Sequence, residues 1–188
     1  MASLFGQGIN VDRDRPHIFH RDYWPLKVIR QGVLDFAEQL RTNGSVKTCL
    51  DYGAGVSPYA KHFQDRGIRV ICADINPADA SIVKIDAETG RVDLLDESVD
   101  AILSTQVLEH VPEVNRYLRE AVRLLRPGGL MFLSTHGMCL LHRHPTDLWR
   151  WTVDGLRYEL ERAGLVVHNV TPKIGMLSTS TYCRSTVY

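Results

Sequence analysis

Short apolar segments alternate along the chain with amphipathic segments of helical period, and this alternation restricts the fold more than any other feature. Six apolar runs predict strands, at residues 46–50, 68–73, 81–85, 99–104, 130–135 and 165–170. Four segments predict helices, at residues 25–43, 57–66, 112–126 and 153–163, with Ser57 as the expected N-cap of the second. Because strands interleaved with helices form parallel sheets, we predict an α/β domain built on a mostly parallel sheet.

The length and charge of the chain exclude several classes of protein. Its 188 residues, 44% of them hydrophobic, can bury a core without disulfides or metals. The 22 basic and 22 acidic residues give no net charge, which argues against binding nucleic acid through a basic surface. No apolar stretch approaches the roughly 18 residues of a membrane span, and the four cysteines form no close pair. We expect a cytoplasmic protein with neither nucleic-acid nor membrane partners.

The composition divides the chain into three parts. Residues 1–24 are polar and aromatic without a regular period, and predict an N-terminal arm. Residues 25–171 contain all the predicted helices and strands. Residues 172–188 predict a Ser/Thr-rich C-terminal tail.

Two glycines and an aspartate lie just after the first two predicted strands, where ligands bind in open parallel sheets. Gly53 and Gly55 allow a tight turn and the close approach of a ligand to the backbone. Asp74 follows Gly53 by 21 residues, at the end of the next strand, where a carboxylate can accept hydrogen bonds from two ribose hydroxyls. The pattern predicts a site for a nucleoside-containing ligand.

The residues around this turn favour S-adenosylmethionine over a dinucleotide. The dinucleotide fingerprint has a small residue where this chain has Pro58. Asp51 precedes the first glycine by two positions, and its charge would repel a pyrophosphate but suits an ammonium or sulfonium group. An NAD-dependent oxidoreductase therefore stays as a disfavoured alternative.

Five motifs, in their order along the chain, resemble those of class I S-adenosylmethionine-dependent methyltransferases. They are LDYGAG at 50–55, Asp74, Asp86, the segment from VDAIL at 99–103 to VLEHV at 107–111, and LRPGGL at 125–130. The resemblance covers about residues 46–171. It implies a doubly wound, Rossmann-like sheet with helices on both faces and one antiparallel strand near the edge.

The resemblance also implies which residues bind S-adenosylmethionine. They are Asp51, Gly53, Ala54 and Gly55 for the methionine part, Asp74 for the ribose, Asp86 and Ala87 for the adenine, and Gln106 where the loop after the fourth strand passes the methionine end of the cofactor and the acceptor. Ile75, next to Asp74, is a further candidate for binding the cofactor. The sulfonium already activates the methyl group, so such an enzyme mainly aligns a nucleophile behind it.

A general base is needed only where the acceptor is a hydroxyl. His110 is the nearest candidate, because it follows the fourth strand by a short turn and imidazole has a suitable pKa. A structural hydrogen-bonding role for His110 is an equal alternative, since Leu-Glu-His is widespread in the resembling family across many substrates.

The segment between the fifth strand and the last helix is the other candidate for binding the acceptor. Residues 145–156, PTDLWRWTVDGL, are similar to a segment of bacterial methyltransferases that act in polysaccharide and other glycan biosynthesis. That similarity implies His144 and Asp147 as candidates for proton removal, and Trp149 and Arg150 as candidates for acceptor contact. The alternative is that the charged pair simply pins the loop.

A metal site in the same segment is a weaker hypothesis. Its potential ligands are His136, Cys139, His142 and His144. Their spacing matches no standard zinc pattern, so no metal is expected.

The C-terminal residues depart from the family pattern. The family normally adds a further antiparallel strand after residues 165–170, but residues 177–188, LSTSTYCRSTVY, are too polar to be assigned as that strand. If the strand is missing, the exposed sheet edge needs cover, and a homodimer is one remedy.

The function that these residues favour is methyl transfer from S-adenosylmethionine to a small-molecule or glycan-type acceptor, at oxygen. An alternative from another class is a non-catalytic nucleoside-binding module that regulates or scaffolds a partner. Turnover of the cofactor, as opposed to binding alone, separates the two.

Overall fold

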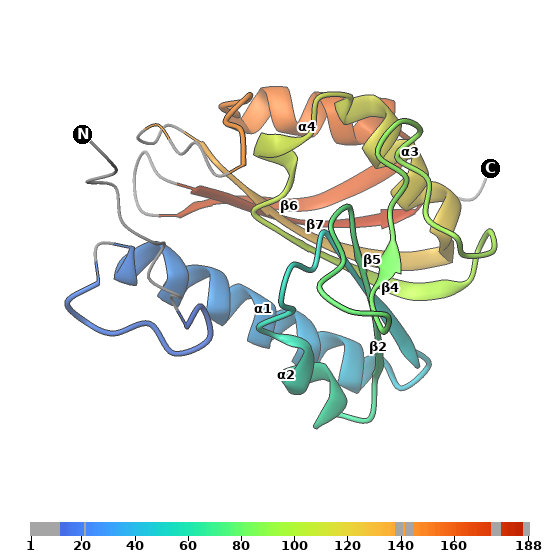
Figure 1. Ribbon diagram of the computed structural model, residues 1–188, viewed down its shortest axis with the longest axis horizontal. Coiled ribbons are helices and arrows are strands. Elements are labelled where there is room, and N and C mark those ends of the chain that lie inside the picture. The colour runs from blue at the N-terminus through green and yellow to red at the C-terminus, as the bar shows by residue number, and fades with distance from the viewer. Residues whose placement is uncertain (1–11, 21, 138–140, 142–144, 174–177, 186–188) are drawn as a thin grey trace.

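A seven-stranded sheet forms the centre of the computed structural model, which describes residues 12–20, 22–137, 141, 145–173 and 178–185. The strand order is β3-β2-β1-β4-β5-β7-β6 (Figure 1). The strands are β1 (Thr48–Tyr52), β2 (Arg69–Asp74), β3 (Val83–Lys84), β4 (Val99–Thr105), β5 (Leu125–Thr135), β6 (Leu165–Lys173) and β7 (Ser178–Ser185).

The pairing of the strands brings the ends of β1, β2 and β4 together. Each of the neighbouring strands in the series β3-β2-β1-β4-β5 pairs in parallel, and β7 runs antiparallel to both β5 and β6. Asp51 of β1 is in register with Cys72 of β2 on one side and Leu103 of β4 on the other. Strand order reverses at β1, because the chain continues to β2 on one side and later returns to β4 on the other. Open α/β sheets bind their ligands at such a reversal.

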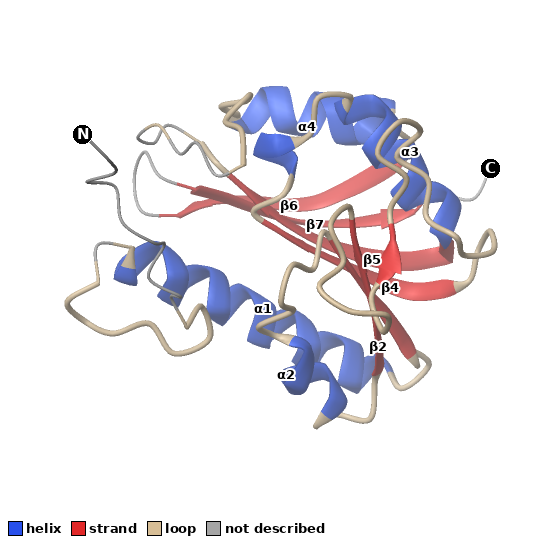
Figure 2. Cartoon of the chain, viewed as in Figure 1, coloured by secondary structure: helices blue, strands red, loops and turns tan. Residues whose placement is uncertain are grey.

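Helices cover both faces of the sheet (Figure 2). Helices α1 (Tyr23–Asn43) and α2 (Ala60–Gln64) lie on one face, and α3 (Val114–Leu124) and α4 (Val153–Arg162) lie on the other. Each face has its own buried apolar cluster. The predicted α/β fold with helices on both faces is therefore confirmed. No helix in the described part of the chain is both long and apolar enough to cross a membrane.

The packing of α1 shows why its sequence forms an amphipathic helix. Its buried residues recur at helical spacing and are Ile29, Val33, Phe36, Ala37 and Leu40. Phe36 stacks on Phe132 of β5 with ring centroids 5.7 Å apart, and meets Phe63 of α2 edge-on at 6.2 Å. Gly44, with a φ of 69°, ends the helix in the left-handed conformation that favours glycine.

The C-terminal residues form a strand of the sheet, which corrects the predicted tail at 172–188. Strand β7 pairs with β5 through Phe132↔Tyr182 and with β6 through Val170↔Thr181. The sequence criterion failed because it required apolar alternation, whereas the backbone of β7 is hydrogen-bonded to neighbours on both sides whatever its side chains. The expected dimer rested on a missing strand at this edge, so the structure removes the reason for it.

The helix after β1 is shorter than predicted, and Ser57 does not cap it. Helix α2 begins at Ala60 and has 5 residues. Ser57 has a left-handed φ of 47°, and its hydroxyl donates a 2.6 Å hydrogen bond to Asp51. The buried carboxylate therefore uses the hydroxyl that was predicted to cap the helix. Strand β3 is also short, because only Val83–Lys84 pair with β2.

A threonine side chain caps the N-terminus of α4. The Thr152 hydroxyl accepts a 3.0 Å hydrogen bond from the backbone N–H of Gly155. We expect Thr152→Ala to lower the free energy of unfolding by about 1 kcal/mol, because one N–H of the first turn loses its partner. Chemical denaturation of both proteins measures the difference, with Thr152→Ser as the variant that keeps the cap. An alanine variant as stable as the serine variant would contradict the assignment.

Candidate functional site

The turn after β1 brings its backbone close to the loop that follows β4. The N–H groups of Gly53 and Ala54 both donate to the carbonyl of Ala73, at 2.9 and 3.0 Å. Gly53 has a φ of +83°, and a Cβ there would lie 2.6 Å from Cγ2 of Val107. Gly55 has a φ of +54° and open space where its Cβ would be. The first glycine is thus required by packing, and the second leaves room for a ligand.

Asp51 is a buried carboxyl group at the end of β1. Its relative exposure is 3%. Burial raises its pKa to about 6, the hydrogen bond from Ser57 lowers the pKa, and the nearby charge of Asp74 raises it again. Removing a carboxylate from water is unfavourable unless a partner compensates. An ammonium group that binds beside Asp51 would supply that compensation.

Asp74 joins the second strand to the glycine turn. One of its carboxylate oxygens accepts a 2.8 Å hydrogen bond from the N–H of Gly55, and the other accepts one of 2.8 Å from the N–H of Asn76. Ile75, beside it, is 45% exposed. The structure therefore brings Asp51, the glycine turn and Asp74 together, as predicted. A buried acid, a Cβ-free opening and a second acid on the next strand fit the ammonium and ribose groups of S-adenosylmethionine.

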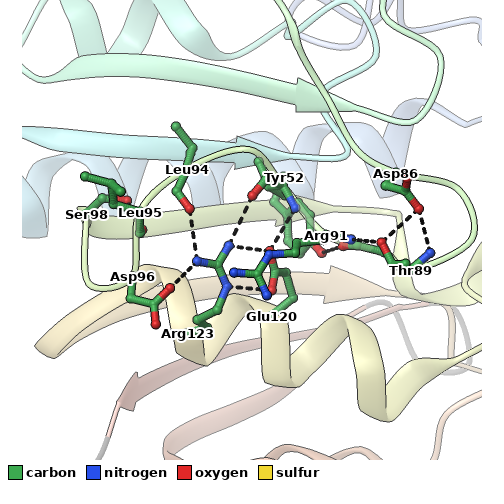
Figure 3. A network of polar contacts seen from close by, with 12 residues as sticks. Tyr52, Asp86, Thr89, Arg91, Leu94, Leu95, Asp96, Ser98, Glu120 and Arg123 are labelled. Atoms are coloured by element: carbon green, nitrogen blue, oxygen red, sulfur yellow. Dashed lines mark hydrogen bonds and ion pairs between the residues drawn. The ribbon is translucent and has the colours of Figure 1, made fainter.

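Asp86 lies after β3 in a turn that its own side chain holds. One carboxylate oxygen accepts hydrogen bonds from the N–H group and the hydroxyl of Thr89, at 2.7 and 2.8 Å (Figure 3). The same oxygen accepts a 3.0 Å bond from the N–H of Glu88. These bonds, with the Thr89 N–H first, lower the pKa of Asp86. Ala87 is exposed next to it. Asp86 thus has a structural role in this turn, beside the adenine contact that the resemblance implies.

Arg123 of α3 fixes the chain that follows this turn (Figure 3). Its guanidinium donates to the carbonyl groups of Val92 and Leu94, at 3.1 and 3.0 Å, and to the carboxylate of Asp96. It also pairs with Glu120, whose carboxylate accepts a 2.8 Å bond from the N–H of Val92. The segment between β3 and β4 is therefore held against α3.

Gln106 follows β4 and faces β5. Its φ is 57°, its N–H donates to the carbonyl of Ser134 at 2.8 Å, and its side-chain amide donates to the Ser134 hydroxyl at 3.3 Å. A left-handed residue at a strand end changes the direction of the chain. Gln106 thus starts the loop that the sequence analysis expects on the acceptor side of the site.

His110 contacts the loop that precedes α4. It lies in η1 (Leu108–His110), and its Nδ1 is hydrogen-bonded to the carbonyl of Thr146. The N–H of Leu148 donates to the Glu109 carbonyl at 2.9 Å, and the indole of Trp149 donates to the Val111 carbonyl at 2.7 Å. These contacts tie the loop to η1, so they support the structural role that the sequence left open for His110.

Asp147 and Arg150 form an ion pair within the same loop. Two hydrogen bonds join them, one of which is 2.5 Å long, and the Asp147 side chain is 1% exposed. The pair links two residues three positions apart in one loop, which agrees with the alternative that it pins the loop. His144, Cys139 and His142 lie outside the described residues, so only His136 of the proposed metal ligands is placed.

Glu109 is a buried acid for which the sequence analysis predicted no role. Its side chain has no exposure, and one carboxylate oxygen accepts a 2.9 Å hydrogen bond from the Thr135 hydroxyl. The other oxygen lies 3.4 Å from Nε2 of His136. Burial raises the pKa of Glu109, and the charge of His110 opposes that effect. The motif that drew attention to His110 contains Glu109, but only the structure shows that the acid is the buried member.

Comparison with known families gives one match over most of the chain. A family described as "Methyltransferase domain" matches residues 20–167. This range includes β1 to β5, the glycine turn and all the described residues assigned to cofactor binding.

Two curated relatives share the central part of the chain. An uncharacterized methyltransferase of Mycobacterium avium is 36% identical over 98 residues, which are 47% of this chain and 39% of that protein. A ubiquinone biosynthesis O-methyltransferase of Mesorhizobium japonicum is 31% identical over 98 residues, 46% of this chain and 39% of that protein. The matched part thus spans about two fifths of the length of these relatives.

A solved structure shares the fold. The 1,6-didemethyltoxoflavin-N1-methyltransferase of Burkholderia thailandensis, solved with 1,6-didemethyltoxoflavin and S-adenosylhomocysteine, has a TM-score of 0.64 and 20% identity. The alignment covers 88% of this chain and 84% of that chain.

Proposed function

Because the chain belongs to the methyltransferase-domain family and has the fold of its class I S-adenosylmethionine-dependent members, we propose that it transfers a methyl group from this cofactor to a hydroxyl of a small molecule. The observation that carries the proposal is the buried carboxyl of Asp51 beside the open space at Gly55, with Asp74 on the next strand. This arrangement suits a ligand that combines a cation with a ribose.

Each residue of the site has a proposed role in binding. Asp51 accepts hydrogen bonds from the ammonium group, and Asp74 accepts them from the ribose hydroxyls. Asp86 and Ala87 contact the adenine, and Gln106 borders the acceptor. When bound, S-adenosylmethionine would supply a methyl group on a cationic sulfur. The bond from sulfur to the methyl carbon breaks as the acceptor oxygen bonds to that carbon, and the sulfur is left as the neutral thioether of S-adenosylhomocysteine. The acceptor hydroxyl loses its proton in this reaction.

An oxygen acceptor of glycan or other small-molecule type is the finer part of the proposal. It is supported by the 31% identical O-methyltransferase and by the sequence of residues 145–156. His110 and Asp147 are proposed as groups that could take the proton, and Trp149 and Arg150 as acceptor contacts. These four residues also hold the loop. His110 is hydrogen-bonded to the carbonyl of Thr146, Trp149 donates to the carbonyl of Val111, and Arg150 pairs with Asp147.

Cofactor binding is tested by isothermal titration with S-adenosylmethionine and S-adenosylhomocysteine. We expect Asp74→Ala to weaken both ligands at least tenfold, or about 1.4 kcal/mol, because the ribose loses a bidentate acceptor. Asp35→Ala is a matched control, since Asp35 is exposed on α1 and its carboxylate bonds only to Gln31 among the contacts described. Equal affinities for the two variants would contradict the assigned ribose site.

Turnover separates the enzyme from a non-catalytic nucleoside-binding module. The wild-type chain is incubated with labelled S-adenosylmethionine and a panel of sugars and phenols, and the release of S-adenosylhomocysteine is measured. Product that depends on an added acceptor supports methyl transfer. Tight binding without product across the panel would favour the non-catalytic module.

A further inference from the structure

Residues 12–15 form an anchored turn beside the first half of α1, within the dark blue loop of Figure 1. The Asp12 carboxylate accepts 3.0 Å hydrogen bonds from the N–H groups of Asp14 and Arg15. The Asp14 carboxylate in turn binds Arg30 of α1 at 3.0 Å and His62 of α2 at 2.6 Å. Both helices therefore hold this part of the N-terminal arm.

A third contact joins the same turn to the segment between the glycine turn and α2. The hydroxyl of Tyr59 donates a 3.3 Å hydrogen bond to the carbonyl of Arg13. Tyr59 is 1% exposed and follows the glycine turn by four residues, directly before α2. The backbone of Arg13 is thus fixed beside the Tyr59 hydroxyl, while the residue itself is exposed.

The charge of Arg13 acts on both sides of the site. Burial raises the pKa values of Asp51 and Glu109, and the Arg13 charge lowers both. Asp51 lies near the carboxyl end of β1 and Glu109 follows β4, its neighbour in the sheet, so one side chain that influences both lies near the carboxyl ends of these two strands. Among the described residues, Arg13 is the one cation that acts on Asp51.

We propose that Arg13 binds the carboxylate of the methionine part of S-adenosylmethionine and so completes the cofactor site. The inference rests on the proposed function. The cofactor carries an ammonium group, a sulfonium group and a carboxylate. The acidic residues of the site suit the two cations but repel the carboxylate, which therefore needs a basic partner. A guanidinium can hold a carboxylate through two parallel hydrogen bonds, and the anchors on either side of Arg13 keep it in place.

Decarboxylated S-adenosylmethionine tests this role, because it keeps both cations and lacks only the carboxylate. We expect Arg13→Ala to lower the affinity for S-adenosylmethionine about tenfold in isothermal titration, and to change the affinity for the decarboxylated ligand less than twofold. Arg13→Lys keeps the charge and should recover part of the loss, since an ammonium replaces the two-pronged contact by a single one. The difference between the two ligands isolates the carboxylate contact.

Arg15→Ala is the matched control, because Arg15 is exposed two residues away in the same turn. It should leave both affinities unchanged. Equal losses for the two ligands in Arg13→Ala, or no loss for either, would overturn the role of Arg13 while leaving the proposed function intact. Failure of the wild-type chain to bind S-adenosylmethionine would overturn both.

Discussion

Gly53→Ala is expected to lower the free energy of unfolding by about 2–5 kcal/mol. The left-handed φ of +83° is unfavourable for any residue with a Cβ, by roughly 1–2 kcal/mol. The new methyl group would also lie 2.6 Å from Val107, so the loop after β4 must move, and such overpacking costs about 1–3 kcal/mol. Urea denaturation followed by circular dichroism measures the change.

Alanine variants at two other glycines separate the backbone penalty of a left-handed φ from the close contact with Val107. Gly44 at the end of α1 has a φ of +69° with nothing near its Cβ position, so Gly44→Ala should show the backbone penalty alone, about 1 kcal/mol. Gly55 also has open space at that position, but it borders the proposed methionine pocket. Because Gly55 also has a left-handed φ, of +54°, Gly55→Ala should lose about as much stability as Gly44→Ala, and much cofactor affinity as well. If the Gly53 and Gly44 variants lost equal stability, the close packing against Val107 would not matter.

The fold could be predicted where local sequence and tertiary environment agree. Helix α1 has apolar residues on one face and a glycine at its end, and the structure keeps both features. Strand β1 is buried along its whole length, because helices cover both faces of the sheet. Strand β7 could not be predicted in this way, because the pairing of its backbone with β5 and β6 does not show in its composition.

The candidate site could be predicted only in part. Asp51 and Asp74 lie near the carboxyl ends of two strands that pair in the sheet, and Gly53 follows the first of them, so their sequence positions determine that they meet. The roles of Glu109 and Arg13 depend on contacts between segments far apart in the chain, such as Tyr59 with Arg13. Similarly, the sequence pattern of a helix N-cap predicted that Ser57 would cap the next helix. It could not show that the backbone is left-handed at Gly55 and Ser57, or that the Ser57 hydroxyl donates to Asp51 instead.

Asp51→Asn is expected to stabilise the fold and to lower the affinity for the cofactor. The folded pKa of about 6 lies above the ordinary value of 3.8, so the folded state favours the protonated acid. Its contribution to stability is therefore complete below pH 4 and is lost as the pH rises towards 6, by about 3 kcal/mol in total. Asparagine carries no charge and can still accept from Ser57. The variant should unfold at higher denaturant concentration than the wild type at pH 7, and the difference should vanish near pH 4.

The pH dependence of binding should have the opposite sign. An ammonium group beside Asp51 favours the ionised carboxylate, so the cofactor binds to the form of the protein in which Asp51 has lost its proton. In the wild type, affinity for S-adenosylmethionine should be constant above pH 7 and fall towards tenfold per pH unit below about 5.5. Asp51→Asn should bind at least tenfold more weakly at pH 7 and lose this dependence, as measured by titration between pH 5 and 8. Because Asp74 also raises the pKa of Asp51, Asp74→Ala should move the onset of the fall to lower pH.

If Asp51→Asn gained stability without losing affinity, the buried acid would serve some purpose other than the ammonium group. If it lost both, Asp51 would be ionised and compensated in the free protein, which the surrounding groups do not support: Ser57 offers one hydrogen bond, and Arg13 is the one nearby cation in the described part of the chain. Gained stability with lost affinity is the signature of a group whose burial is unfavourable until a cation binds. The same carboxylate then explains both the instability of the free site and its preference for S-adenosylmethionine over an anionic dinucleotide.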